Sequence, residues 1–241
     1  MVKGTPDYMI VTGGRTPERF ITYSQVQVPT LCFEDFEGSV IKWRTTDIAT
    51  LSFDSTDAAG EQASGVYNGS KCLKILPDAG REASIYRIFP LLELVENVGV
   101  SFYFMYEDQE AVINASDGFI LIDLEIWTGS KYLRFIVSYN TTAGKWYYSD
   151  DNTSTYTEFL KRTAVSKENH YIKLFIDLTN SKAKFCIVDG DRKVFDDISL
   201  YSEDDLSTAP GIKITSNARS KADYQATWYM DDFKITYNEP A

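Results

Sequence analysis

One stretch of this chain, from Gly118 to Gly129, alternates so regularly that it leaves little choice of structure. With a period of two residues, four aliphatic side chains fall on one face: Ile120, Ile122, Leu124 and Ile126. The opposite face carries Phe119, Leu121, Asp123, Glu125 and Trp127. This alternation predicts a β-strand that packs its aliphatic face into a core and turns the carboxylates and the indole outward.

The outward face of this strand has two interpretations. An indole can stack on the apolar side of a pyranose ring, and carboxylates accept hydrogen bonds from sugar hydroxyls. Asp123, Glu125 and Trp127 are therefore typical of a saccharide-binding face. Alternatively, the segment is a charged, solvated strand with one incidental tryptophan. The pattern alone does not choose between the two.

Most of the chain after Thr30 has the same strand character. Strand patterns occur at 30–36, 40–46, 49–53, 70–76, 84–89, 98–106, 117–127, 131–139, 144–149, 156–161, 170–178, 182–189, 211–216 and 225–237. Turn signals such as Asn68-Gly69 and Asp189-Gly190-Asp191 separate them. Helix signals are confined to Ser202–Leu206, where Ser202 can cap a single turn. We therefore predict an all-β protein, a two-sheet antiparallel β-sandwich that forms one jelly-roll domain over residues 30–241.

Residues 1–29 differ from this body. They hold three basic residues against two acidic ones, three prolines, the paired glycines Gly13 and Gly14, and little periodicity. We predict an extended N-terminal arm that docks on another subunit of an assembly or wraps its own domain, with a disordered leader as the alternative. The expected anchors are the apolar residues Tyr8, Met9, Ile10, Val11, Phe20 and Ile21, with Tyr8 to Thr12 adding to a sheet edge.

Charge narrows the classes of partner. The net charge is −11 and the pI is near 4.6, so we expect no nucleic acid bound through a basic footprint and no anionic membrane surface. No apolar run has the length of a signal peptide or of a membrane span. We expect a virion surface or, failing that, a cytoplasmic location, and an extracellular one only if a leader has been removed.

Cysteine and histidine offer no catalytic centre. Cys32, Cys72 and Cys186 are far apart, show no metal-ligand spacing, and are predicted to be buried free thiols. His170 is the sole histidine and opens an apolar strand pattern, so we expect a structural role. A nucleophile elbow of the G-x-S-x-G kind is missing from the sequence.

The order of several segments resembles a known family. A DFEG opening at 35–38 is followed by FILIDLEIW at 119–127, YLRFIVSYNTTAGKWYY at 132–148, HYIKLFIDLTNSKAKFCIVDG at 170–190 and WYMDDFKITY at 228–237. Together these look like a concanavalin A-like, or laminin-G-like, jelly roll over about residues 30–237. The resemblance implies the fold, and it implies functions common among such domains, namely glycan binding and a place on phage or virus surfaces.

The same resemblance suggests a further possible function, that of a glycoside hydrolase. Laminarinase-like members of this fold carry Glu-x-Asp-x-Glu on one strand, with the first carboxylate as nucleophile and the last as acid/base. The matching triplet here is Leu121, Asp123 and Glu125, so leucine stands at the nucleophile position. We therefore predict that the protein is not an enzyme. Asp123 and Glu125 can still bind sugar, or they can pair across strands with Arg134.

Aromatic and basic residues on neighbouring strands extend the candidate face. The predicted ligand-binding set is Asp123, Glu125, Trp127, Tyr132, Arg134, Trp146 and Tyr148, with Tyr171 further along the chain. A sheet face that mixes such groups can hold a polysaccharide or a protein partner. The alternative is that a second layer or a long loop covers this face and that the aromatics are ordinary packing.

A third group of residues is acidic. Glu34, Asp35 and Glu37 lie near the start of the body, and Asp231 and Asp232 near its end. In jelly rolls of this kind the first and last strands often pair, which would bring these carboxylates together. Oxygen ligands at one place suit Ca²⁺, so Asp35, Glu37, Asp231 and Asp232 are candidate ligands of a structural calcium, with solvated acidic ends as the alternative. No cofactor is required by the sequence.

These features favour a non-enzymatic structural or adhesive protein. The predicted arm suggests a virion or assembly decoration protein that contacts other protein subunits. The Asp123–Trp127 face suggests a carbohydrate-binding module instead, and the two roles are compatible. A glycoside hydrolase is disfavoured by Leu121.

Overall fold

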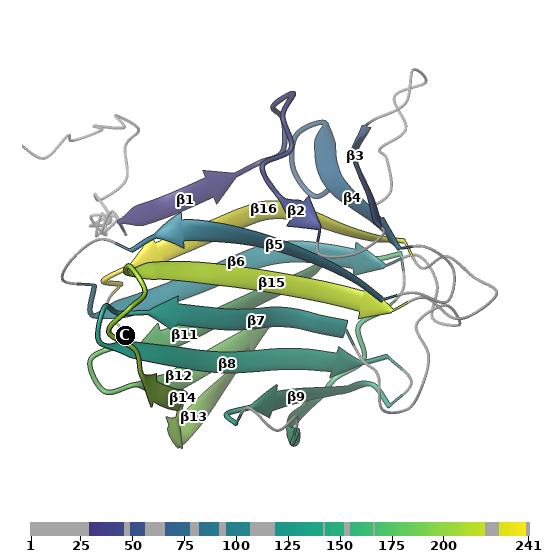
Figure 1. The fold of residues 1–241 in the computed structure, drawn as a ribbon. Helices are drawn as coiled ribbons and strands as arrows, with labels where there is room; N and C mark the ends of the chain where they lie inside the picture. Colours follow the sequence, from purple (N-terminus) through teal and green to yellow (C-terminus); the bar gives the residue numbers. More distant parts are fainter. Residues whose placement is uncertain are drawn as a thin grey trace, which may run out of the picture.

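Two antiparallel eight-stranded sheets face each other, with strands β5, β15, β7 and β8 in the near layer of Figure 1 and β6, β11 and β12 behind them. The structure is a computed structural model that describes residues 29–45, 49–55, 66–77, 82–91, 95–106, 119–141, 143–151, 155–165, 167–219 and 227–239. All of its regular elements are β-strands. The predicted all-β sandwich is confirmed.

The two sheets are built as follows. Sheet A runs in the order β13 (Asp191–Ser199), β12 (Lys182–Val188), β11 (His170–Asp177), β6 (Asn97–Tyr106), β16 (Trp228–Tyr237), β4 (Lys71–Pro77) and β3 (Ala49–Ser55), with β1 (Thr30–Glu34) paired to β16. Sheet B runs in the order β10 (Thr157–Lys161), β9 (Lys145–Ser149), β8 (Lys131–Asn140), β7 (Phe119–Trp127), β15 (Gly211–Arg219), β5 (Glu82–Pro90) and β2 (Arg44–Thr45), with β14 (Tyr201–Asp204) paired to β8.

The core lies between the sheets and follows the alternation of the sequence. Ile122, Leu124 and Ile126 of β7 are buried, as are the aliphatic residues at 172, 174 and 176 of β11. Each such side chain contributes about 1.5–3 kcal/mol when it leaves water. The predicted inward faces are confirmed at these positions, whereas the side chain of Ile120 is not among those described.

Strand β16 changes partner along its length. Its first half, Trp228 to Met230, pairs with β4, and its second half pairs with β1. The register against β6 shifts between Asp231 and Lys234, and Asp232 has a φ of 47°. A bulge of this kind bends a strand and lets it leave one neighbour for another. The expected pairing of the first and last strands of the body is confirmed.

Strands β13 and β14 were not predicted as such. Residues 202–206, expected as a helical turn, lie partly in β14, because Tyr201–Asp204 pairs with the free edge of β8. The turn before β13 is as expected: Asp189 and Gly190 have φ values of 48° and 88°. Positive φ at both central residues is the mark of a type I′ hairpin, for which Asp-Gly is a preferred sequence.

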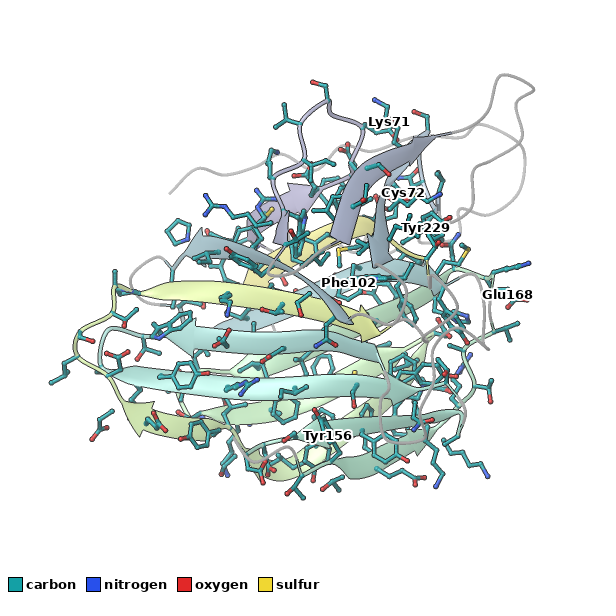
Figure 2. The ribbon with its side chains drawn as sticks, turned by 45° about the vertical axis from the view of Figure 1, so that its right-hand side comes forward. Lys71, Cys72, Phe102, Tyr156, Glu168 and Tyr229 are labelled. Atoms are coloured by element: carbon teal, nitrogen blue, oxygen red, sulfur yellow. The ribbon has the colours of Figure 1, made fainter. Side chains whose placement is uncertain are left out.

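The cysteines are free thiols, as predicted, with Cys72 and Cys186 buried and Cys32 half-buried. Cys72 lies beside Tyr229 around β4 in Figure 2, in a small apolar cluster outside the main core. The predicted arm and its anchors Tyr8, Met9, Ile10, Val11, Phe20 and Ile21 fall outside the described residues, so its docking stays a prediction. Within the described residues, no helix has the length and apolarity to cross a membrane.

Candidate functional site

The outer face of sheet B is organised in rows, because paired residues on neighbouring antiparallel strands point to the same side. The register places Glu125 of β7 between Lys213 of β15 and Arg134 of β8. Beyond these, Lys213 is paired with Ile88 of β5 and Arg134 with Tyr201 of β14. One row of side chains therefore crosses the sheet from β5 to β14.

An aromatic platform lies next to this row. We define it as Trp127, Tyr132 and Tyr201, which come from three adjacent strands. The ring centroids of Trp127 and Tyr132 are 5.5 Å apart, and those of Tyr132 and Tyr201 are 6.2 Å apart. Gly211 is the β15 partner of Trp127 and contributes no side chain beside the indole. The platform is partly exposed and offers aromatic surface of the kind that stacks on sugar rings.

Each carboxylate of β7 has a basic partner of its own. Arg134 binds Asp123 through two hydrogen bonds, Nε to Oδ1 at 2.9 Å and Nη2 to Oδ2 at 2.7 Å. Glu125 accepts from Lys213 Nζ at 2.5 Å and from the Tyr132 hydroxyl at 3.1 Å. The predicted cross-strand pairing with Arg134 is therefore confirmed for Asp123, whereas the ion-pair partner of Glu125 is Lys213.

The network holds its protons firmly. Burial, followed by the negative charge of Glu125, raises the pKa of Tyr132 far above its usual value. The hydrogen bonds to Asp123 raise the pKa of Arg134, although burial acts in the opposite direction. A phenol and a guanidinium in these states donate hydrogen bonds and do not take up protons near neutral pH. The arrangement therefore suits binding better than general base catalysis.

Three aromatic residues expected on this face lie elsewhere. Trp146 and Tyr148 of β9 point inward: Trp146 is 0% exposed and donates its indole N–H to Arg162 O, and the Tyr148 ring packs against that of Phe135. Their placement on the outer face was wrong, because the outward positions of β9 begin at Lys145 and not at the tryptophan. Tyr171 belongs to β11 and therefore to sheet A, on the opposite side of the sandwich.

A pocket of about 220 Å³ opens where β2 meets β5. Its lining residues are Lys42, Arg44, Tyr86, Arg87 and Ile88. Arg44 is paired with Tyr86 in the register, so both side chains point to the outer face of sheet B. Lys213 extends over the ring of Tyr86, with its Nζ 5.8 Å from the ring centroid, and joins the pocket to the row of ion pairs.

The acidic residues proposed as calcium ligands bind different hydrogen-bond donors of the protein. Glu37 accepts hydrogen bonds from the Ser70 hydroxyl and from the Lys71 N–H, and Asp35 accepts from the Glu37 N–H. Asp231 is 0% exposed, and its carboxylate is bound by backbone N–H groups. Among the described residues, no three His, Cys, Asp or Glu side chains converge to hold a metal.

One oxygen in this region lacks a partner. Asp232 Oδ1 is buried and has no hydrogen bond among the described residues. Burial and the charge of Asp35 raise the pKa of Asp232, while a hydrogen bond with Asn68 lowers it. Burial also raises the pKa of Asp231, to about 6. The side chains of Asp35 and Asp232 lie close enough for their charges to interact, and a structural calcium at these residues stays a prediction.

Sequence reasoning missed four residues of this face. Lys213 alternates with the buried Ile212 and Ile214, so the same period-2 rule could have placed it outward. Tyr201 was hidden because the residues that follow it were interpreted as a helical turn. Arg44 and Tyr86 become neighbours through the pairing of β2 with β5, which no local pattern predicts.

Comparison with known proteins gives the fold. No protein-family model matches the chain, and no curated protein matches it. Among solved structures, a carbohydrate esterase from the Shiga toxin-encoding bacteriophage phi24B superposes with a TM-score of 0.55 and 11% identity, over 88% of this chain and all of the other. The globular domain of T. cruzi calreticulin gives a TM-score of 0.50 and 14% identity, over 87% of this chain and 89% of that domain. The chain thus has the two-sheet architecture of the concanavalin A-like jelly rolls.

Proposed function

We propose that this protein is a non-enzymatic carbohydrate-binding module and that a saccharide chain lies on the outer face of sheet B. The observation that carries the proposal is the aromatic platform beside a row of ion pairs, Trp127, Tyr132 and Tyr201 next to Lys213, Glu125 and Arg134. The proposal depends on these side chains and not on the fold, because jelly rolls serve many unrelated functions.

The chemistry of the face matches a sugar in two ways. Partly exposed aromatic rings cover the apolar side of a pyranose at low cost in conformational entropy. The ion pairs are part-exposed, with 26% of the Arg134 side chain and 29% of the Lys213 side chain accessible. Their remaining N–H groups and carboxylate lone pairs can donate to and accept from hydroxyls while the charges stay paired.

Hydrolysis is disfavoured by the same contacts. A retaining glycosidase needs two carboxyl groups that flank the scissile bond, one of them free to act as an acid and a base. Here Asp123 is held by a bidentate guanidinium and Glu125 by an ammonium and a phenol. Both carboxylates are therefore engaged by these partners, and Leu121 occupies the nucleophile position.

A role in a virion or another assembly remains a second proposal that rests on the sequence of residues 1–29. It is tested separately by deleting those residues. We expect the sandwich to keep its cooperative thermal unfolding while assembly or docking is lost, and loss of the cooperative transition would contradict the proposal.

Binding is tested by replacing the centre of the platform. Trp127→Ala should weaken binding to a responsive oligosaccharide, found on a glycan array and measured by calorimetry, by at least tenfold, which corresponds to about 1.4 kcal/mol. Tyr67→Ala is the matched control, because Tyr67 is an exposed aromatic stacked on Tyr103 of sheet A. Equal losses in both variants, or an array on which nothing binds, would contradict the proposal.

A further inference from the structure

The pocket between β2 and β5 is basic although the protein as a whole is strongly acidic. Lys42, Arg44 and Arg87 line it, and the whole chain has a net charge of −11. Lys42 Nζ and Arg87 Nη1 both lie 3.0 Å from the same oxygen, Oε2 of Glu34. Two cations thus share one carboxylate. Among the described residues, Arg44 has no carboxylate within ion-pair distance.

The charge of this pocket is not cancelled by the neighbouring rows. Arg134 and Lys213 each form an ion pair with one carboxylate of β7, so these pairs add no net charge near the pocket. Glu34 is the sole carboxylate in contact with the three basic residues of the pocket among the described residues. Counted over the described residues, the pocket therefore keeps an excess of two positive charges. The acidic groups elsewhere reach it weakly, since salt screens charges beyond about 8 Å at physiological ionic strength.

The pocket opens on the same outer face of sheet B as the aromatic platform. Tyr86 and Ile88 belong both to its lining and to the outer face of sheet B, where Ile88 pairs with Lys213 and Lys213 with Glu125. From β2 to β7 there are three strand spacings, or roughly 14 Å. An oligosaccharide can span this distance, whereas a single sugar cannot. The volume of about 220 Å³ is below that of pockets which enclose a whole ligand, so it suits one charged group of a longer chain.

We infer that the saccharide is an acidic one, and that the β2–β5 pocket binds one of its carboxylate or sulfate groups while neighbouring rings lie on the aromatic platform. This inference rests on the function proposed above and adds the class of ligand. Arg44 is the residue that would contact the anion, because its side chain is exposed, points to the outer face and has no carboxylate partner within the described part of the chain. A planar guanidinium matches both carboxylate and sulfate oxygens with paired N–H donors.

The test compares ligands that differ in charge alone. Calorimetry would measure binding of polygalacturonate against its fully methyl-esterified form, and of dextran sulfate against dextran. We expect at least one acidic form to bind tenfold or more tightly than its neutral counterpart, and the pair that shows the preference identifies carboxylate or sulfate. Arg44→Gln should abolish the preference and leave binding of the neutral form within twofold.

Arg192→Gln is the matched control, because it removes the same charge from sheet A, where Arg192 stacks on Phe185. It should leave the preference unchanged. Equal binding of acidic and neutral forms, or an equal effect of both substitutions, would overturn the inference while leaving the proposed function in place. If no saccharide binds in either form, or if Trp127→Ala leaves saccharide binding unchanged, the proposed function is contradicted and the inference with it.

Discussion

Two acidic pairs of this chain, Asp123/Glu125 on β7 and Asp231/Asp232 on β16, look alike in the sequence but are neutralised differently. On β7 each carboxylate is bound by a side-chain cation at a part-exposed surface. On β16 the Asp231 carboxylate accepts the backbone N–H groups of residues 67–68 at 2.8 and 3.0 Å, and that of Asp232 at 2.8 Å. Both carboxylates of the first pair bind side-chain cations, whereas in the second pair the Asp231 carboxylate binds backbone N–H groups.

The two kinds of partner suit different roles, ligand binding on β7 and structural support on β16. Side-chain partners on an outer face can share their hydrogen bonds with a ligand, because both ends of the ion pair keep unused donors and acceptors. Backbone partners at a bulge are fixed by the chain, and the carboxylate that binds them fixes the loop at residues 66–70 against β16 in return. Sheet B is therefore the part of the molecule that suits a ligand, and the β16 bulge is the part that suits a joint between strands.

The largest expected effect comes from the bulge. Asp231→Ala leaves three backbone N–H groups without an acceptor, and we expect a loss of about 3 kcal/mol in the free energy of unfolding, measured by urea denaturation. Asp232→Ala should cost clearly less, because its Oδ1 has no hydrogen-bond partner among the described residues. If the two variants lose equal stability, the structural distinction between Asp231 and its neighbour is wrong.

A smaller effect is expected on β7. Asp123→Ala should cost about 1.5 kcal/mol, because it removes the charged acceptor from a partly buried guanidinium. The double variant Asp123→Ala/Arg134→Met should recover part of this loss, since no unpaired charge then remains. A double variant that is less stable than either single variant would show that the pair supports the sheet more than it supports a ligand.

The pH dependence distinguishes the regions further. The folded pKa of Asp231 is raised to about 6, so its contribution favours folding at low pH and is lost as pH rises from about 4 through 6. Burial lowers the pKa of His170, but hydrogen bonds to Asp189 and to Val165 O outweigh it and raise the pKa. Both partners are hydrogen-bond acceptors, so the protonated imidazolium, which donates from both nitrogens, binds them best. The contribution of His170 to the free energy of unfolding is therefore lost as the pH rises above about 6.5.

We therefore expect each group to shape one part of the stability curve. Asp231→Asn should reduce the fall in stability between pH 4 and 6, and His170→Gln should reduce the fall above pH 6.5, both relative to the parent protein. The comparison uses differences because Asp177, Asp189 and Glu37 have lowered pKa values and act in the opposite direction. Curves that remain parallel to the parent curve would contradict these assignments.

The fold was largely accessible from the sequence, because each strand of a sandwich shows its inward face as a local period-2 pattern. The site was accessible only in part. Asp123, Glu125, Trp127, Tyr132 and Arg134 follow from the patterns of β7 and β8, which are adjacent in sequence and paired in the sheet. Trp146 and Tyr148 share one face of β9, while Lys145, Tyr147 and Ser149 share the other, so the more apolar face was the one that packs inward.

Long-range pairing explains the rest. Lys213 reaches Glu125 because β15 inserts between β7 and β5, and Arg44 reaches the same face because β2 extends β5. Neither neighbour is encoded in a short window of sequence. The acidic residues at the two ends of the body do come close through the pairing of β1 with β16, but the N–H donors that bind Asp231 belong to a separate loop.

The smallest effect concerns calcium. Because Glu37 and Asp231 already accept hydrogen bonds, we expect removal of Ca²⁺ with a chelator to leave the thermal midpoint unchanged to within about 1 °C, whereas tight binding would shift it by several degrees. Scanning calorimetry with and without millimolar Ca²⁺ measures this. A large upward shift that disappears in Asp232→Ala would instead support a structural calcium at Asp35 and Asp232.

The four tryptophans allow the most direct test of saccharide binding on sheet B. Trp43, Trp146 and Trp228 are buried in the core, whereas Trp127 lies on the outer face. In a ¹⁵N-indole NMR spectrum, addition of a bound oligosaccharide should shift the Trp127 resonance and leave the other three in place. A bound oligosaccharide that leaves the Trp127 indole unshifted would contradict our account.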